Sequence, residues 1–278
     1  MEWQSMNVND RPVALVTGAS SGMGKDFALR LIHEGYTVYG AARRVERMKE
    51  IVMAGGLTLA LDVTDDQSMV DAVARIINEQ GRIDVLINNA GYGQFGALEE
   101  VPIAEGRRQI ETNLMGVARL TQLCLPHMRE QGGGRIINIS SIGGKLATPL
   151  GSWYHASKYA LEGLSDSLRN EVRAFGISVV VIEPGGVESE WSQIATGEAM
   201  RYSAHGAYAG LVRSFSKMQG RLKLPPPKVI SDLVVKALRA KHPKARYHGG
   251  HLAGPLLFLR RHLSDRLFDR LVTLSLKL

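Results

Sequence analysis

The sequence lacks the features of several protein classes. With a single cysteine, Cys124, no disulfide can form within the chain. This residue lies in an apolar run at 120–125, which favours a buried, unreactive thiol over a nucleophile. The eight histidines are scattered without the spacing of metal ligands, so we expect no metal site. No apolar run is long enough to span a bilayer, and residues 1–11 lack the apolar core of a signal peptide. We therefore expect a cytoplasmic globular protein with a loose extension at 1–11.

Acidic residues are scarce in the last part of the chain. Residues 201–278 contain 16 Lys and Arg but only 3 Asp and Glu, so the net charge of +7 originates in this tail. A basic tail can bind an anionic surface, such as lipid headgroups, or an acidic substrate. It can equally neutralise the acidic first part of the chain across an internal or subunit contact. The composition leaves both interpretations open, and without a recognition motif we expect no nucleic-acid binding.

Short apolar segments alternate with helical patterns through the first two-thirds of the chain. The apolar segments lie at 13–17, 37–42, 57–62, 83–88, 135–140 and 177–182. Such alternation predicts an α/β fold, with one doubly wound parallel sheet of the Rossmann type and helices on both faces. We predict one domain over 12–278, in which 190–228 form a substrate lid and 229–278 a basic C-terminal helical segment. In such sheets ligands bind beyond the carboxyl ends of the strands.

A glycine-rich segment follows the first predicted strand. It reads Thr17-Gly18-Ala19-Ser20-Ser21-Gly22-Met23-Gly24 and leads into a helical pattern. Glycines here allow a tight turn and a close backbone approach to a pyrophosphate, which the following helix N-terminus favours. The alternative is an ordinary strand-to-helix turn.

Tyr154 and Lys158 are four residues apart in a segment of good helix formers, so they share one face of a predicted helix. A cation roughly 5 Å from the phenol, at an effective dielectric near 20, favours the phenolate by about 3 kcal/mol. That energy corresponds to roughly two pKa units. We therefore expect Lys158 to lower the pKa of Tyr154 and make it a working acid and base. Such a pair also occurs by chance in helices, so it carries weight only with its neighbours.

These motifs together resemble the short-chain dehydrogenase/reductase family over about residues 12–189. The resemblance rests on the glycine spacing, on Asn88-Asn89-Ala90-Gly91 after the fourth strand, and on Asn113, Ser141, Tyr154 and Lys158 in the family's order. It implies that Tyr154 donates the proton, Ser141 holds the substrate carbonyl oxygen, and Asn113 organises a proton-relay water. Lys158 would bind the nicotinamide ribose as well as act on Tyr154. Ser140 fits the family spacing less well than Ser141.

The resemblance also implies a nicotinamide cofactor. Its contacts would come from Gly18, Ser20, Ser21, Gly22, Met23, Arg43, Asp62, Val63, Asn89, Ala90, Gly91, Tyr154, Lys158, Pro184, Gly185, Val187 and Ser189. The second strand ends in neutral Ala42, where NAD-dependent relatives usually keep Asp. Arg43 can pair with a 2′-phosphate, so we predict NADP(H). The alternative is that Arg43 and Arg44 are solvated loop residues.

Apolar and aromatic residues in and near the expected lid suit a hydrophobic ketone, aldehyde or alcohol. They are Phe95, Leu146, Trp153, Trp191, Tyr202, Tyr208 and Phe215. The resemblance is greatest to the steroid, retinoid and carbonyl reductase branches, and it implies a homodimer or homotetramer. The alternative function is a non-catalytic regulator that senses the cofactor on the same fold. Such relatives usually lose the tyrosine or the lysine, and this chain has both.

The segment 256–278 repeats apolar residues at helical spacing. Leu259, Leu263, Leu267 and Leu271 would form one row of a single helix, with four arginines elsewhere on it. One interpretation is a helix lying in the surface of a membrane, which suits a lipid-soluble substrate. The other is a helix packed on its own domain or on a partner subunit, which we favour because most amphipathic helices serve cores.

Overall fold

The structure is a computed structural model that describes residues 11–276. The predicted N-terminal extension therefore lies, apart from Arg11, outside the described residues. Within them one seven-stranded sheet runs in the order β3-β2-β1-β4-β5-β6-β7, and every pair of neighbours is parallel. The strands are β1 (Val13–Thr17), β2 (Thr37–Ala42), β3 (Leu57–Ala60), β4 (Val85–Asn88), β5 (Gly134–Ile139), β6 (Ile177–Pro184) and β7 (Arg246–Gly249). The strand order reverses at β1 and β4, so the crevice for a ligand opens where these two strands end.

The six predicted strands are all present, and β7 is an edge strand that we did not predict. Its sequence, Arg-Tyr-His-Gly, has no apolar run. It is held by pairing with β6, where Arg246 lies opposite Val181. Pairing with β6 makes this segment a strand, and its own residues do not favour one.

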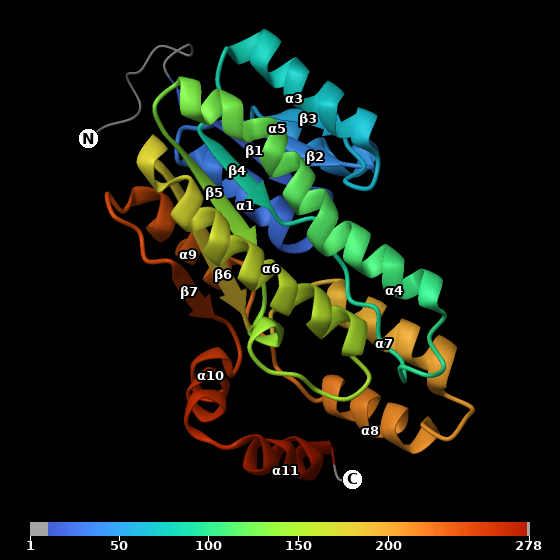
Figure 1. Ribbon diagram of the computed structural model, residues 1–278. Helices are drawn as coiled ribbons and strands as arrows, with labels where there is room; N and C mark the ends of the chain where they lie inside the picture. The colour runs from blue at the N-terminus through green and yellow to red at the C-terminus, as the bar shows by residue number, and fades with distance from the viewer. Residues whose placement is uncertain (1–10, 277–278) are drawn as a thin grey trace.

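Helices cover both faces of the sheet, as expected for a doubly wound fold (Figure 1). One apolar core contains residues of α1 (Gly22–His33), α2 (Lys49–Met53) and α9 (Lys228–Arg239). The other contains residues of α3 (Asp66–Gln80) and α5 (Gly116–Glu130), with α6 (Ser152–Glu171) packed beside them. The strands are buried on both sides, which explains why they read as continuous apolar runs. The predicted fold class is confirmed.

Smaller elements complete the fold. They are the 3₁₀ turns η3 (Val45–Met48), η5 (Ile142–Gly144) and η6 (Arg173–Phe175), helix α4 (Ile103–Ile110), the π-helix η4 (Glu111–Met115), and helices α7 (Trp191–Ser203) and α8 (Ala209–Gln219). α7 and α8 contribute to a third apolar core together with Phe95 and Tyr154. The predicted lid segment is therefore largely helical and rests on the predicted active site.

The tail forms two helices, α10 (Ala253–His262) and α11 (Asp265–Leu276), so the predicted single helix is wrong. The chain is extended at Leu263, which breaks the expected row of leucines. Phe268 is buried on α11, which packs against α8, whereas Leu267, Leu271 and Leu274 are exposed. Figure 1 shows α7, α8, α10 and α11 gathered at one end of the molecule, away from α3. One face of α11 thus packs on its own domain, while membrane contact and subunit association stay predictions. No helix within residues 11–276 combines the length and apolarity needed to cross a bilayer.

Cys124 is fully buried in the core between α5 and the sheet. Burial raises the pKa of its thiol to about 12, which leaves it unreactive, as predicted. We expect iodoacetamide to label the native protein at neutral pH at a rate limited by opening of the fold, and to label the protein in urea at once. Mass spectrometry of timed samples measures both rates. Rapid labelling of the native protein would mean that this thiol is accessible.

Candidate active site

The glycine turn between β1 and α1 needs glycine for two reasons. Gly18 has a φ of +67° and Gly22 a φ of +52°, a region that side chains other than glycine rarely adopt. A Cβ on Gly18 would also lie 2.8 Å from Asn89 Nδ2 and 2.9 Å from Ala90 Cα. The turn is held in place by the end of β4, because Thr17 Oγ1 accepts hydrogen bonds from the Asn89 and Ala90 amides, each at 2.9 Å. The Asn-Asn-Ala-Gly segment after β4 thus supports the glycine turn.

A cavity of about 560 Å³ extends from this turn along the ends of the strands. Of the predicted cofactor residues it is lined by Gly18, Ser20, Ser21, Gly22, Met23, Arg43, Asp62, Val63, Asn89, Ala90, Gly91 and Ser189. The other five, Tyr154, Lys158, Pro184, Gly185 and Val187, are not among its lining residues. Trp191 does line the cavity, and its ring centroid lies 5.2 Å from that of Tyr154.

The part of the cavity beside the glycine turn and the end of β2 suits an anionic ligand. The first turn of α1 carries no acidic side chain, and its N-terminus faces the cavity through Gly22. Arg43 and Arg44 line the cavity after β2, and the Arg43 guanidinium is 3.9 Å from the Asp62 carboxylate. Arg44 also lies 3.9 Å from Glu190, where the lid begins. The residues present therefore fit a phosphate-bearing dinucleotide.

Tyr154 and Ser141 come together at the edge of the lid. Tyr154 is 7% exposed, and the Ser141 hydroxyl lies close enough to its phenol to act on its pKa. Ser141 follows β5, and its Oγ accepts a hydrogen bond from the Gly143 amide at 2.9 Å. It also donates to the Pro184 carbonyl at 3.4 Å. The two hydroxyls thus lie where one substrate oxygen could contact both. Ser140, the less favoured alternative, is buried with no hydrogen-bond partner for its Oγ among the described residues.

The prediction that Lys158 lowers the pKa of Tyr154 is wrong for this structure. Burial raises the pKa of Tyr154 to about 12, which outweighs the lowering by the Ser141 hydroxyl. Lys158 is itself buried and donates a hydrogen bond from Nζ to the Ile139 carbonyl at 2.8 Å. Burial lowers the pKa of its ammonium to about 8. Tyr154 is therefore a protonated phenol at neutral pH, which is the form that donates a proton.

Asn113 is buried in the π-helix η4. Its Nδ2 donates to the Tyr92 carbonyl at 3.0 Å and to Ser157 Oγ at 3.1 Å, and its Oδ1 accepts from the Tyr92 amide. The side chain thereby joins η4 to α6 and to the segment after β4. A π-turn at this point is typical of a functional position, and the relay role of Asn113 stays a prediction.

His155 is a site residue that the sequence reasoning missed. Its Nε2 accepts a hydrogen bond from the Thr148 amide at 3.1 Å, so Nδ1 is the ring nitrogen that donates, to the Gly143 carbonyl at 2.9 Å. Burial lowers the pKa of the imidazole, which favours this neutral form. His155 therefore holds the loop that carries Ser141. Its position next to Tyr154 was the available signal.

Aromatic side chains lie around Tyr154, and the sequence predicted them as lining of the substrate site. Phe95 lies between Trp191 and Phe215, with ring centroids 5.5 Å and 5.3 Å away, and 5.7 Å from Tyr154. Trp153 packs on α4, where a Cβ on Gly106 would overlap its ring. The expectation that Trp153 lies near the lid stays a prediction.

The chain was compared with known proteins. Residues 12–198 match the family model of the short chain dehydrogenases. Human 17-beta-hydroxysteroid dehydrogenase type 1 is 34% identical over 269 residues, which cover 90% of this chain and 81% of that protein. Among solved structures, a short-chain dehydrogenase from Streptomyces avermitilis is 36% identical, with a TM-score of 0.79 over 94% of this chain and 96% of its own. A variant of actinorhodin polyketide ketoreductase with NADPH is 32% identical, with a TM-score of 0.73 over 87% and 97%.

Proposed function

The chain belongs to the short-chain dehydrogenase family and is an oxidoreductase, and from this we propose that it interconverts a hydrophobic carbonyl compound and its alcohol with NADP(H). The observation that carries the proposal is the closeness of the Ser141 and Tyr154 hydroxyls, with Lys158 buried one helical turn away. This group lies beside a cavity formed by the glycine turn. A regulator that only senses the cofactor would not need all three side chains.

A bound nicotinamide would supply the hydride in reduction and accept it in oxidation. The protein's part is to handle the charge and the proton on the substrate oxygen. Ser141 would hold that oxygen through its hydroxyl. Tyr154 would give it the phenolic proton during reduction and take it back during oxidation. Lys158 would place a positive charge close to the phenol and hydrogen-bond the ribose once the ammonium turns from Ile139.

Arg43 would select NADP(H) by pairing with the 2′-phosphate. Replacing Arg43 by Asp places a carboxylate where the phosphate binds, so we expect NADPH affinity to fall about a hundredfold, while NADH affinity changes little or rises. Fluorescence titration with each cofactor measures both constants. Lys49→Asp makes the same change of charge on an exposed residue that does not line the cavity. An unchanged NADPH/NADH ratio in the Arg43 variant would mean that another residue selects the cofactor.

The substrate class follows from the aromatic residues around Tyr154 and is supported by the similarity to a human hydroxysteroid dehydrogenase. Phe95, Trp191 and Phe215 offer flat apolar surfaces to a bulky ring or chain. The experiment that tests the function is a screen of NADPH oxidation with steroids, retinal, aliphatic aldehydes and quinones. Turnover of at least one hydrophobic carbonyl is expected, whereas consistent failure across the screen would contradict the proposal.

A further inference from the structure

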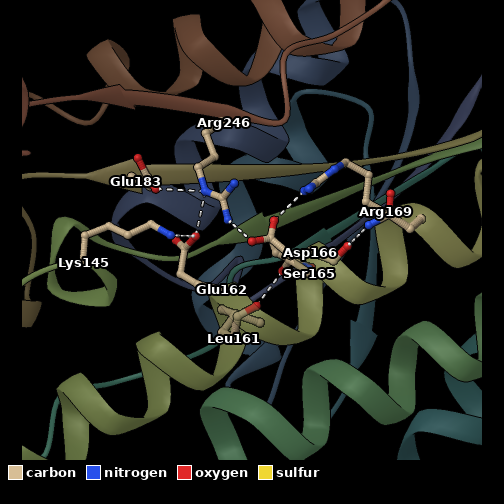
Figure 2. A network of polar contacts seen from close by, with 10 residues as sticks. Lys145, Leu161, Glu162, Ser165, Asp166, Arg169, Glu183 and Arg246 are labelled. Carbon is tan, nitrogen blue, oxygen red and sulfur yellow. Dashed lines mark hydrogen bonds and ion pairs between the residues drawn. The ribbon is translucent and has the colours of Figure 1, made fainter. Parts of the chain in front are cut away.

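A network of charged side chains joins α6, β6 and β7 to the residue after η5 (Figure 2). Its centre is Glu162, one helical turn after Lys158 on α6. Glu162 Oε2 is 2.8 Å from Lys145 Nζ and 2.9 Å from Arg246 Nε. The same Arg246 Nε is 3.4 Å from Glu183 Oε1 on β6. Two carboxylates from different elements thus share one guanidinium from the edge strand β7.

The two carboxylates that share Arg246 are deeply buried, whereas the cations that pair with them are partly exposed. The side chains of Glu162 and Glu183 are 5% and 4% exposed. Within residues 11–276, Oε1 of each accepts no hydrogen bond, and the contact of Glu183 with Arg246 is an ion pair only. Burying two carboxylates together is unfavourable unless cations pair with them, and it raises the pKa of Glu183 to about 7. A fold does not need such a cluster for stability, since apolar side chains of similar size would pack as well.

The network connects the segments that carry the reactive side chains. Lys145 comes directly after η5, the turn that begins after Ser141. Glu162 is on the helix that carries Tyr154 and Lys158. The packing between the two segments is tight, because a Cβ on Gly144 would lie 3.0 Å from Glu162 Cγ and 3.1 Å from the Lys158 carbonyl oxygen.

Lys158 has few charged neighbours that could keep it protonated. Burial lowers the pKa of Lys158, and Glu162 is the charged group that raises it. Tyr154 precedes Lys158 by one turn on α6, and β5 offers the ammonium a neutral carbonyl. The other charged groups of the network affect Lys158 indirectly, through their ion pairs with Glu162 and with one another. They are Lys145 after η5, Glu183 on β6, Arg246 on β7 and Asp166 further along α6.

We propose that Glu162, held by Lys145 and Arg246, is a positioning residue that keeps the Lys158 ammonium charged in its buried site and fixes the Ser141 loop against α6. The inference rests on the proposed function, since it assigns to Lys158 a role in binding the cofactor. Glu162 touches neither substrate nor cofactor and acts through Lys158.

The test measures how NADPH affinity depends on pH. Quenching of tryptophan fluorescence reports the binding. In the wild-type protein the NADPH Kd should rise above about pH 8, where Lys158 loses its proton. Glu162→Gln keeps the size of the side chain and removes its charge. Because an anion favours a nearby ammonium, we expect the rise in Kd to begin about one pH unit lower in this variant. Between the two pH values, NADPH binding should be weakened up to about tenfold.

Three further variants separate this role from a general loss of structure. Glu162→Asp retains the charge and should restore the wild-type onset at least in part. Asp166→Asn removes a carboxylate that pairs with the same Arg246 but is 43% exposed, and it should leave the onset unchanged. Lys158→Met should abolish the rise, which assigns it to this lysine.

Each outcome bears on one claim. If Glu162→Gln binds NADPH with the wild-type pH dependence, or if Asp166→Asn shifts the onset equally, the proposed role of Glu162 is wrong although the enzyme assignment stands. If the wild-type protein does not bind NADPH, the cofactor assignment itself fails. A Glu162→Asp variant that behaves like Glu162→Gln would assign the shift to altered packing and also overturn the proposal.

Discussion

Replacing Tyr154 by Phe is expected to lower kcat for carbonyl reduction by about a thousandfold, because it removes the hydroxyl that gives its proton to the substrate oxygen. The ring itself should stay in place, since it packs against Phe95 and Trp191 through its faces and edges. NADPH affinity and the melting temperature should therefore change little. The measurement is NADPH oxidation with the best substrate from the screen, together with a cofactor titration.

Tyr159 provides the matched control for this variant. It is on the same helix, five residues further along the chain, and it is 43% exposed. Tyr159→Phe removes an identical hydroxyl away from Ser141 and should retain full activity. A Tyr154→Phe protein with turnover within a few-fold of wild type would show that another group donates the proton.

Replacing Gly18 by Ala is expected to abolish detectable NADPH binding and to lower the free energy of unfolding by about 3 kcal/mol. The added methyl group would meet Asn89 and Ala90 at contacts below 3 Å, and the backbone has a positive φ. Either the turn or the end of β4 must move, and both line the cavity. Urea denaturation and cofactor titration measure the two effects.

Gly81 separates the backbone effect from the steric one. It has a φ of +71°, close to that of Gly18, but a Cβ there would meet no atom within 4 Å. Gly81→Ala should therefore cost only the strain of a positive φ, about 1 kcal/mol, and should leave NADPH binding intact. If both variants lost the same stability and both bound NADPH, the close packing of the glycine turn would not matter for the cofactor.

Some elements of the fold can be recognised from a short segment of sequence, and others cannot. The six core strands are recognisable because each is buried on both faces and must be apolar along its length. The strand β7 and the break at Leu263 cannot be recognised in this way, because each depends on contacts with distant elements. A helical repeat of leucines looks the same whether the chain continues straight or turns between two helices.

The electrostatics of the site were predicted least well. Counting residues along a helix puts Lys158 near Tyr154, and the pKa prediction followed from that distance alone. The folded protein adds burial, which acts on both groups and dominates the pKa of each. It also adds a competing partner for Lys158, the carbonyl of Ile139.

By itself, the sequence determined the fold class and the glycine turn, and it supplied the candidates for the reactive side chains. These properties depend on short segments whose residue types have few alternatives, such as glycine at a positive φ. Only the tertiary structure decided the protonation states, the hydrogen bonds of His155 and the burial of Glu162 beside Arg246. The physical reason is that solvent exposure and the partner of each charge depend on elements far apart in the chain, such as Glu162 and Arg246, which are 84 residues apart. No local pattern records them.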